Sequence, residues 1–314
     1  MSQHKGWKKV KYELLYQLIK GLIKLANWAS RNMLMWSFGK LGGLVYYIMP
    51  KTRDLTLKHL KYAYENELSD AEIQNIAKKV FSNLGKNFTD IVRYPSIRTR
   101  EELTAVMEVE GEQHLIDAYN KGKGVILLTC HRGAFDMVGF YLSMSNYPCI
   151  AIGAKLHDEK LNDLVVKTRR HNKNDQADFV ERSDPRGSIK MFKKLKDGGL
   201  AFLLIDQDTD KVQNTFVDFF GKPAATPIGA ATLALKADSA IIPASIKLQS
   251  NGKHLLEFRP EVPLEKTGNL KEDIKTNTQN MSLALEKFIR EAPDQWVWFH
   301  ERWKTKQEEE VSNS

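Results

Sequence analysis

The sequence contains little cysteine and no long hydrophobic run. Its 314 residues include two cysteines, Cys130 and Cys149, and both lie in apolar, strand-like segments. This arrangement indicates neither a disulfide framework nor a zinc motif, so a reducing compartment is the default expectation. The longest uncharged run near the N-terminus, residues 41–50, is well short of the roughly 18 apolar residues that predict a membrane-spanning helix. No small-residue cleavage site indicates a signal peptide.

Several catalytic fingerprints are also absent. The sequence contains no Gly-x-Ser-x-Gly elbow, no P-loop and no dinucleotide-binding glycine pattern. Asp206, Asp208 and Asp210 begin like a calcium loop. However, Lys211 stands where the turn glycine belongs, and Val217 stands where the bidentate glutamate belongs. We therefore expect neither a metal nor a cofactor.

The basic residues are concentrated near the N-terminus. The formal net charge is +8, yet residues 1–62 hold twelve Lys and Arg against two acids, a local charge of +10. The other 252 residues therefore carry a net charge of −2. The basic character belongs to the N-terminal segment, and it indicates an anionic partner for that segment alone.

The same segment has the pattern of an amphipathic helix. Apolar residues recur at helical spacing along one face, and polar residues occupy the other. With its tryptophans, the segment is predicted to lie in a membrane interface, although a helix packed on the domain would show the same spacing. Nucleic acid binding is disfavoured, because the cations alternate with large aliphatic side chains. The apolar face is Leu14, Leu15, Leu18, Leu22, Leu25 and Ala29, the polar face is Lys20, Lys24, Asn27 and Arg31, and the tryptophans are Trp7, Trp28 and Trp36.

A second helical region follows, with clear boundaries. Ser69 and Glu72 have the spacing of a capping box, an apolar stripe runs from Ile73 to Ile91, and Pro95 ends the helix. We interpret this stripe as core packing.

From about residue 105 the sequence alternates between strand-like and helical segments, and no linker rich in Pro, Gly or Ser divides it. Such alternation predicts an α/β fold with a mixed, mostly parallel sheet flanked by helices. We expect a basic amphipathic segment over residues 1–52, an α/β domain with its own N-terminal helices over residues 53–306, and a disordered acidic tail over residues 307–314. The predicted strands lie near residues 124–130, 148–153, 177–180, 200–205, 240–246 and 254–258, and the helices near 113–120, 137–144, 158–170, 184–196, 229–237 and 269–291.

The segment from Gly124 to Asp136 carries the clearest chemical pattern. An apolar run ends at Cys130 and is followed by His131, a glycine turn and a carboxylate. Such a strand delivers His131 to the carboxyl edge of the sheet, where open α/β sheets bind ligands. Asp136 could fold back onto the imidazole and make it a general base. By spacing alone His131 could instead cap the next helix. Cys130 is better explained as a buried strand residue than as a nucleophile.

Other blocks of the sequence resemble one enzyme family. His131-x4-Asp136 resembles the hallmark of glycerolipid-type acyltransferases, and residues 179–182 and 242–244 resemble two further blocks of that superfamily. Residues 204–226 and 293–304 resemble the branch that acylates lipid A precursors, the lauroyl/myristoyl acyltransferases. That branch usually carries Glu where this chain has Asp136. The resemblance implies direct acyl transfer, in which His131, oriented by Asp136, deprotonates the acceptor hydroxyl.

The resemblance also implies residues that bind substrate. Arg182 matches the arginine that binds the anionic head group of the acceptor. Arg169 and Arg170 are further candidates, because a guanidinium fork suits oxyanions, although they could equally form a solvated helix face. Asp206-Gln207-Asp208 are expected at the substrate site, where they would hold the arginines and nearby loops.

The implied donor is acyl carrier protein or acyl-CoA, and the implied acceptor is a lipid A precursor at the cytoplasmic face of the inner membrane. Two other functions use the same dyad: acylation of another membrane glycolipid or a lysophospholipid, and hydrolysis of a lipid by water. A catalytically silent membrane-binding protein would account for the N-terminal segment alone.

Overall fold

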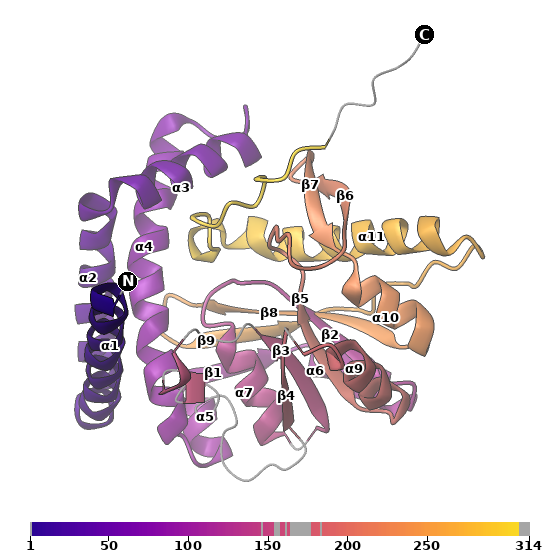
Figure 1. The fold of residues 1–314 in the computed structure, drawn as a ribbon, viewed down its shortest axis with the longest axis horizontal. Coiled ribbons are helices and arrows are strands. Elements are labelled where there is room, and N and C mark those ends of the chain that lie inside the picture. The colour runs from indigo at the N-terminus through magenta and orange to yellow at the C-terminus, as the bar shows by residue number, and fades with distance from the viewer. Residues whose placement is uncertain are drawn as a thin grey trace.

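The computed structural model describes residues 2–145, 147–153, 158–160, 162–163, 177–182 and 184–307. A seven-stranded sheet forms its centre, helices cover both faces, and α1 to α4 stand together along one end (Figure 1). The predicted α/β class is confirmed. The helices are α1 (Ser2–Trp28), α2 (Arg31–Ile48), α3 (Pro50–Ala63), α4 (Asp70–Arg93), α5 (Arg100–Val106), α6 (Glu112–Asn120), α7 (Asp136–Met144), α9 (Gly187–Lys196), α10 (Gly229–Ala237) and α11 (Leu270–Glu291), with 3-10 turns at Tyr94–Ser96 and Pro293–Gln295. The strands are β1 (Met107–Glu110), β2 (Val125–Thr129), β3 (Cys149–Gly153), β4 (Ala177–Glu181), β5 (Leu200–Leu204), β6 (Asn214–Phe219), β7 (Lys222–Pro227), β8 (Ala240–Leu248) and β9 (His254–Phe258).

Strand β2 lies in the middle of the sheet, whose order is β1-β9-β8-β2-β5-β3-β4. It runs parallel to both of its neighbours, β8 and β5. The β8–β9 pair is antiparallel, and the remaining pairs of this sheet are parallel. Parallel strands are covered on both faces, and every residue of β2 is buried, as its continuous apolar run requires.

Alternate residues of β2 face two separate hydrophobic cores, as the two-residue period of a strand requires. Ile126 and Leu128 pack in one core with residues of α9, α10 and α11. Val125 and Leu127 pack in the other core with residues of α5, α6 and α7. The carboxyl end of β2 therefore emerges between two packed layers, which fix the loop that follows it.

The N-terminal helices pack on the domain through α4. The predicted capping box is present, since Ser69 and Glu72 bond each other's backbone at the start of α4. Helix α2 crosses α4 so closely that a Cβ added at Gly42 would lie 2.2 Å from the carbonyl oxygen of Phe81. Only glycine allows this approach of the two backbones. Within the described part of the chain, no helix has the length and apolar character to cross a bilayer.

The predicted amphipathic segment forms two helices, with a break between α1 and α2 at residues 29–30. Much of its apolar face is exposed: Leu14 is 67% and Leu18 58% exposed, and Trp28 is 84% exposed. Arg31, assigned to the polar face, begins α2 and pairs with Asp90 of α4 instead. This part of the helical face is therefore an attachment to the domain.

Among the elements that were not predicted individually, β1 and the β6–β7 hairpin belong to β-structure. Strand β1 extends the sheet beside β9, and β6 and β7 form a separate antiparallel hairpin that stands beside α11 (Figure 1). The side chain of Gln279 on α11 bonds the backbone N–H and carbonyl of Asp218 and holds this hairpin in place. The chain then returns from α11 to the carboxyl edge of the sheet, where Trp296 contacts Asp206, the second residue after β5. The helix predicted near 158–170 and the tail beyond residue 307 fall largely outside the described residues.

Candidate active site

His131 and Asp206 meet because the two central strands are in register. Strands β2 and β5 pair from Val125 opposite Leu200 to Thr129 opposite Leu204, a constant offset of 75 residues. His131 and Asp206 have the same offset, and each is the second residue after its strand. Each is therefore delivered to the carboxyl edge of the sheet by its own strand, the edge at which α/β proteins bind ligands.

The two side chains form a hydrogen-bonded pair. Nδ1 of His131 lies 2.8 Å from Oδ1 of Asp206, and the backbone N–H of His131 donates to Oδ2 over 2.8 Å. Because an ionised carboxylate can only accept, Nδ1 carries the proton and Nε2 keeps its lone pair. The His131 side chain is 21% exposed, and that of Asp206 is fully buried. A buried carboxylate thus holds a partly exposed imidazole whose Nε2 can act as a base.

Asp206 is kept ionised by its partners. Burial alone would raise its pKa, but the charge of a protonated His131 and the hydrogen bonds from His131 and Trp296 outweigh burial and hold the pKa below its ordinary value. The Trp296 indole donates Nε1–H to Oδ2 over 2.7 Å. The carboxylate is therefore available to stabilise an imidazolium at any pH near neutrality.

Cys130, directly before His131, is structural. Its thiol is buried, 3.4 Å from Oγ of Ser245 on β8. Burial raises the pKa of this thiol to about 12. Since the thiolate is the nucleophilic form, Cys130 is unsuited to covalent catalysis near pH 7, in agreement with its interpretation as a small buried residue.

Asp136, the predicted partner of His131, is the first residue of α7. A carboxylate in this position interacts favourably with the helix dipole. The contact that the structure gives to Nδ1 of His131 comes from Asp206. The catalytic role of Asp136 stays a prediction. Asp206, which was expected to hold arginines and loops, is the carboxylate bonded to the histidine.

The other predicted site residues are distributed around this pair. Asp208 accepts hydrogen bonds from Thr305, at 2.7 Å from the backbone N–H and 2.9 Å from the hydroxyl, and so holds the C-terminal segment. Gln207 lies half-buried between the two aspartates. Arg182 is exposed. Arg169 and Arg170 lie outside the described residues.

An apolar cavity of about 670 Å³ begins at the residue before Asp206. Ile205 and the end of β5 form one wall, α9 and α10 form others, and Arg182 and Lys236 supply cations to its lining. Its volume falls within the roughly 300–1,000 Å³ that is usual for ligand pockets. The cavity and the His131–Asp206 pair therefore share the end of β5.

Two residues of the site were not singled out from the sequence, and both lie in the C-terminal block that resembles the acyltransferases. Trp296 is buried and bonded to Asp206. His300 is half-buried, and burial lowers its pKa although the charge of Asp206 opposes this. The resemblance of residues 293–304 was the signal for both, but the resemblance of a whole block does not say which side chain contacts which partner.

Comparison with known proteins finds relatives that are named acyltransferases. The family model described as bacterial lipid A biosynthesis acyltransferase matches residues 8–305. The chain is 26% identical over 275 residues to a lipid A biosynthesis acyltransferase of Haemophilus influenzae, covering 87% of this chain and 82% of the relative. It is 26% identical over 276 residues to the lipid A biosynthesis lauroyltransferase of Escherichia coli, covering 85% and 84%. It is 23% identical over 220 residues to a phosphatidylinositol mannoside acyltransferase of Mycobacterium tuberculosis, covering 70% and 67%.

Proposed function

Because the chain belongs to the family of bacterial lipid A biosynthesis acyltransferases, we propose that it transfers a fatty acyl chain from the thioester of acyl carrier protein or coenzyme A to a hydroxyl of a lipid A precursor. The observation that carries the proposal is the His131–Asp206 pair at the carboxyl edge of the sheet, 2.8 Å apart. A base at this edge next to an apolar cavity suits a reaction between a polar hydroxyl and a long acyl chain.

In the proposed mechanism His131 acts as the general base in a ternary complex. Nε2 takes the proton of the acceptor hydroxyl while its oxygen attacks the thioester carbonyl. The C–O bond forms, the C–S bond breaks, and the imidazolium gives its proton to the departing sulfur, so the step balances without an acyl-enzyme. General-base assistance of this kind contributes about 10²- to 10⁴-fold to the rate. The charge of Asp206 stabilises the imidazolium, and Asp136 remains a second candidate for this role.

The apolar cavity is proposed to hold the acyl chain of the donor. Its walls are largely aliphatic, and it begins at Ile205, next to the carboxylate that orients His131. A thioester carbonyl at the mouth of this cavity would lie near the base, with the chain buried behind it. Arg182, exposed at the lining, is proposed to bind an anionic group of the acceptor or the carrier-protein phosphate.

The N-terminal helices are proposed to dock on the cytoplasmic face of the inner membrane. Trp28 and Trp36 are 84% and 67% exposed, and Leu41 and Leu44 of α2 are also exposed. Each nearby Lys or Arg adds about 1 kcal/mol of attraction to an anionic surface. Replacing Trp28 and Trp36 with serine should weaken binding to anionic vesicles without changing the fold. Equal vesicle binding by the double variant would contradict this docking mode.

The sharpest test of the proposed function varies the acceptor. Purified protein receives acyl carrier protein or coenzyme A carrying an acyl chain, with a lipid A precursor, a phosphatidylinositol mannoside, a lysophospholipid or no acceptor. Mass spectrometry should find the acyl ester on the lipid A precursor. Transfer to another lipid would reassign the acceptor, and release of fatty acid without any acceptor would indicate a hydrolase. Lipids from cells with and without the protein should differ by the same ester.

A further inference from the structure

We propose that Arg132 is a positioning residue for the reaction at His131. Its buried guanidinium fixes the turn after β2 and so keeps the imidazole aligned with Asp206. This inference rests on the proposed function, because it concerns the rate of acyl transfer. It assigns a role to a residue at one of the four unspecified positions between His131 and Asp136 in the motif.

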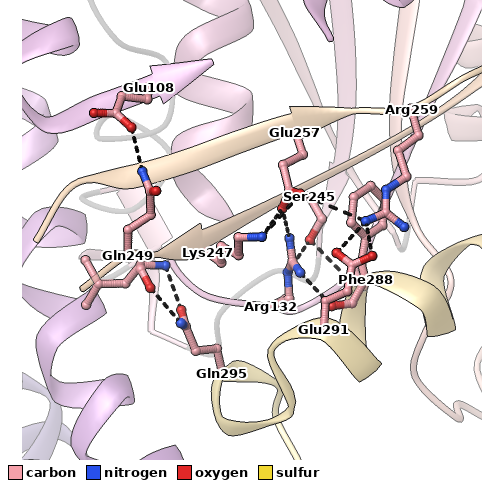
Figure 2. Close-up of polar contacts among 12 residues, drawn as sticks. Glu108, Arg132, Ser245, Lys247, Gln249, Glu257, Arg259, Phe288, Glu291 and Gln295 are labelled. Atoms are coloured by element: carbon pink, nitrogen blue, oxygen red, sulfur yellow. Dashed lines mark hydrogen bonds and ion pairs between the residues drawn. The ribbon is translucent and has the colours of Figure 1, made fainter. Parts of the chain in front are cut away.

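Arg132 is fully buried, which is unusual for an arginine in a turn. Three of its nitrogens donate hydrogen bonds to three elements (Figure 2). Nε donates to Oγ of Ser245 on β8 over 2.9 Å, Nη1 to the carbonyl of Phe288 on α11 over 2.5 Å, and Nη2 to Oε2 of Glu257 on β9 over 2.8 Å. A buried charge costs several kcal/mol unless it is paired and hydrogen-bonded. The forked geometry of these bonds suits a guanidinium and no other side chain.

The backbone of the same turn is held at both ends. The N–H of Arg132 donates to the carbonyl of Cys130 over 2.8 Å, and that of Gly133 donates to the carbonyl of Gln295 over 2.9 Å. Gly133 has φ +59°, and a Cβ there would lie 2.6 Å from the carbonyl oxygen of Ile246. The turn is therefore built for close approach to its neighbours.

The turn that carries His131 and the side chain of Asp206 both contact the segment Gln295–Trp296. The position of Arg132 in this turn therefore affects the alignment of the pair. Trp296 donates to Asp206 and forms an isolated bridge with the backbone of Arg132. Gln295, its neighbour, is bonded through its side chain to the backbone of Leu248 at the end of β8. Arg132 ties the histidine turn to β8 and α11, the elements that support this segment. The alignment of the His131 imidazole with the Asp206 carboxylate is therefore fixed by β8, α11 and the segment Gln295–Trp296 together.

Arg259 provides a matched control. Its guanidinium lies 3.8 Å from the centre of the Phe288 ring, which Arg132 also contacts at 5.0 Å, and it lies 3.9 Å from Glu257. It bonds Glu291, and its side chain is 25% exposed. Arg259 thus shares the ring and the carboxylate with Arg132, but its hydrogen bonds lead to α11 and not to the turn (Figure 2).

The experiment compares R132K with R259K. Lysine keeps the charge but cannot donate to three elements at once. R132K should lower kcat by about 10- to 100-fold with KM for donor and acceptor within about twofold, as expected when a reacting group is misplaced by a fraction of an ångström. R259K should leave kcat within about twofold of the wild-type value. Equal kcat values for the two variants would overturn the proposal.

A double-mutant cycle separates positioning from a general loss of structure. If Arg132 acts through the contact between His131 and Asp206, R132K should lower kcat by less than about threefold in a D206N background. Multiplication of the two single effects would overturn the proposal. If R132K does not fold, E257Q, which keeps an acceptor for Nη2 but removes its charge, replaces it in the same cycle.

The positioning role of Arg132 can also be tested if the protein does not have the proposed function. Should the wild-type protein transfer no acyl chain, NMR of the hydrogen-bonded Nδ1–H proton of His131 reports its contact with Asp206 directly. The chemical shift of this proton should differ from the wild type in R132K and match it in R259K. An unchanged chemical shift in R132K would contradict the positioning role irrespective of the reaction.

Discussion

The described part of the molecule contains two histidine–aspartate pairs that have the same separation and different surroundings. His131 and Asp206 lie 2.8 Å apart at the carboxyl edge of the sheet, and His254 of β9 and Asp90 of α4 also lie 2.8 Å apart. The side chain of His131 is 21% exposed, whereas that of His254 is completely buried. Nδ1 of His254 is itself buried and has no hydrogen-bond partner among the described residues. The length of the histidine–aspartate hydrogen bond therefore does not distinguish a catalytic pair from a structural one. The solvent exposure of the histidine does distinguish the two pairs.

The charges around the two carboxylates differ as well. Asp90 also accepts two hydrogen bonds from Arg31, at 2.8 and 2.6 Å, and Arg31 donates further to the carbonyl of Gly252. This group joins α2, α4 and the β8–β9 turn, so it is a structural junction. Asp206 instead accepts from Trp296 and a backbone N–H, neither of which carries charge. The charge of Asp206 therefore acts mainly on His131, where it can stabilise the imidazolium that a general base forms.

The largest expected effect is at His131. H131A should lower the rate of acyl transfer by about 10²- to 10⁴-fold, because it removes the general base of the proposed mechanism. Its thermal unfolding should stay close to the wild-type curve, since the imidazole is partly exposed and leaves no large cavity. Circular dichroism and a transfer assay on the same preparation measure both quantities. Product formation at the wild-type rate would exclude the mechanism.

The next effect distinguishes the two candidate carboxylates. D206N keeps an oxygen for Trp296 and the backbone but removes the charge opposite the imidazole, so kcat should fall by about 10²-fold. In D136N, kcat should fall by less than about tenfold if Asp136 acts mainly through its interaction with the start of α7. The comparison uses kcat at saturating donor and acceptor. A larger loss in D136N than in D206N would restore Asp136 as the partner of His131.

The sequence predicted the parts of this site but not their pairing. The strands that lead to His131 and Asp206 were both recognised from their apolar runs. His131 and Asp206 were also recognised as polar residues at the ends of these strands. Their contact depends on β5 lying next to β2 in the sheet, and strand order is a long-range property that no local pattern contains. Asp136 was preferred because proximity in the chain is visible and proximity across a sheet is not. The His254–Asp90 junction went unpredicted for the same reason, since its residues are 164 positions apart.

Substitution in the His254–Asp90 pair should affect stability more than activity, the opposite of the effect expected for the His131–Asp206 pair. D90A leaves Arg31 and His254 without their shared acceptor, and breaking a buried ion pair costs about 3 to 5 kcal/mol of unfolding free energy. Activity per folded molecule should stay within about twofold of the wild type, because the hydrogen bonds of the junction involve neither His131 nor Asp206. Chemical denaturation measures the first quantity and active-site-normalised kcat the second. A large loss of kcat with unchanged stability would reverse the two assignments.

The same pair gives a pH dependence with a definite sign. Burial would raise the pKa of Asp90, but the hydrogen bonds and charges of His254 and Arg31 prevail and lower it. A lowered folded-state pKa stabilises the protein above the carboxyl's unfolded pKa of about 3.9, and the contribution is lost as pH falls through the folded-state value. The stability difference between wild type and D90A should therefore be smaller at pH 3 than at pH 7. A difference that grows on acidification would show that Asp90 is not the titrating group.

The smallest effect concerns the neutral donor to Asp206. W296F preserves the ring packing against Phe219 and Trp298 but removes the Nε1–H that bonds Oδ2. One lost hydrogen bond to a carboxylate should lower kcat by about three- to tenfold, well short of the loss in D206N, because the charge itself remains. The removal of this donor also makes the carboxylate easier to protonate, so the loss should be greater at acidic than at neutral pH. An equal loss across the pH range would mean that Trp296 supports the site through packing alone.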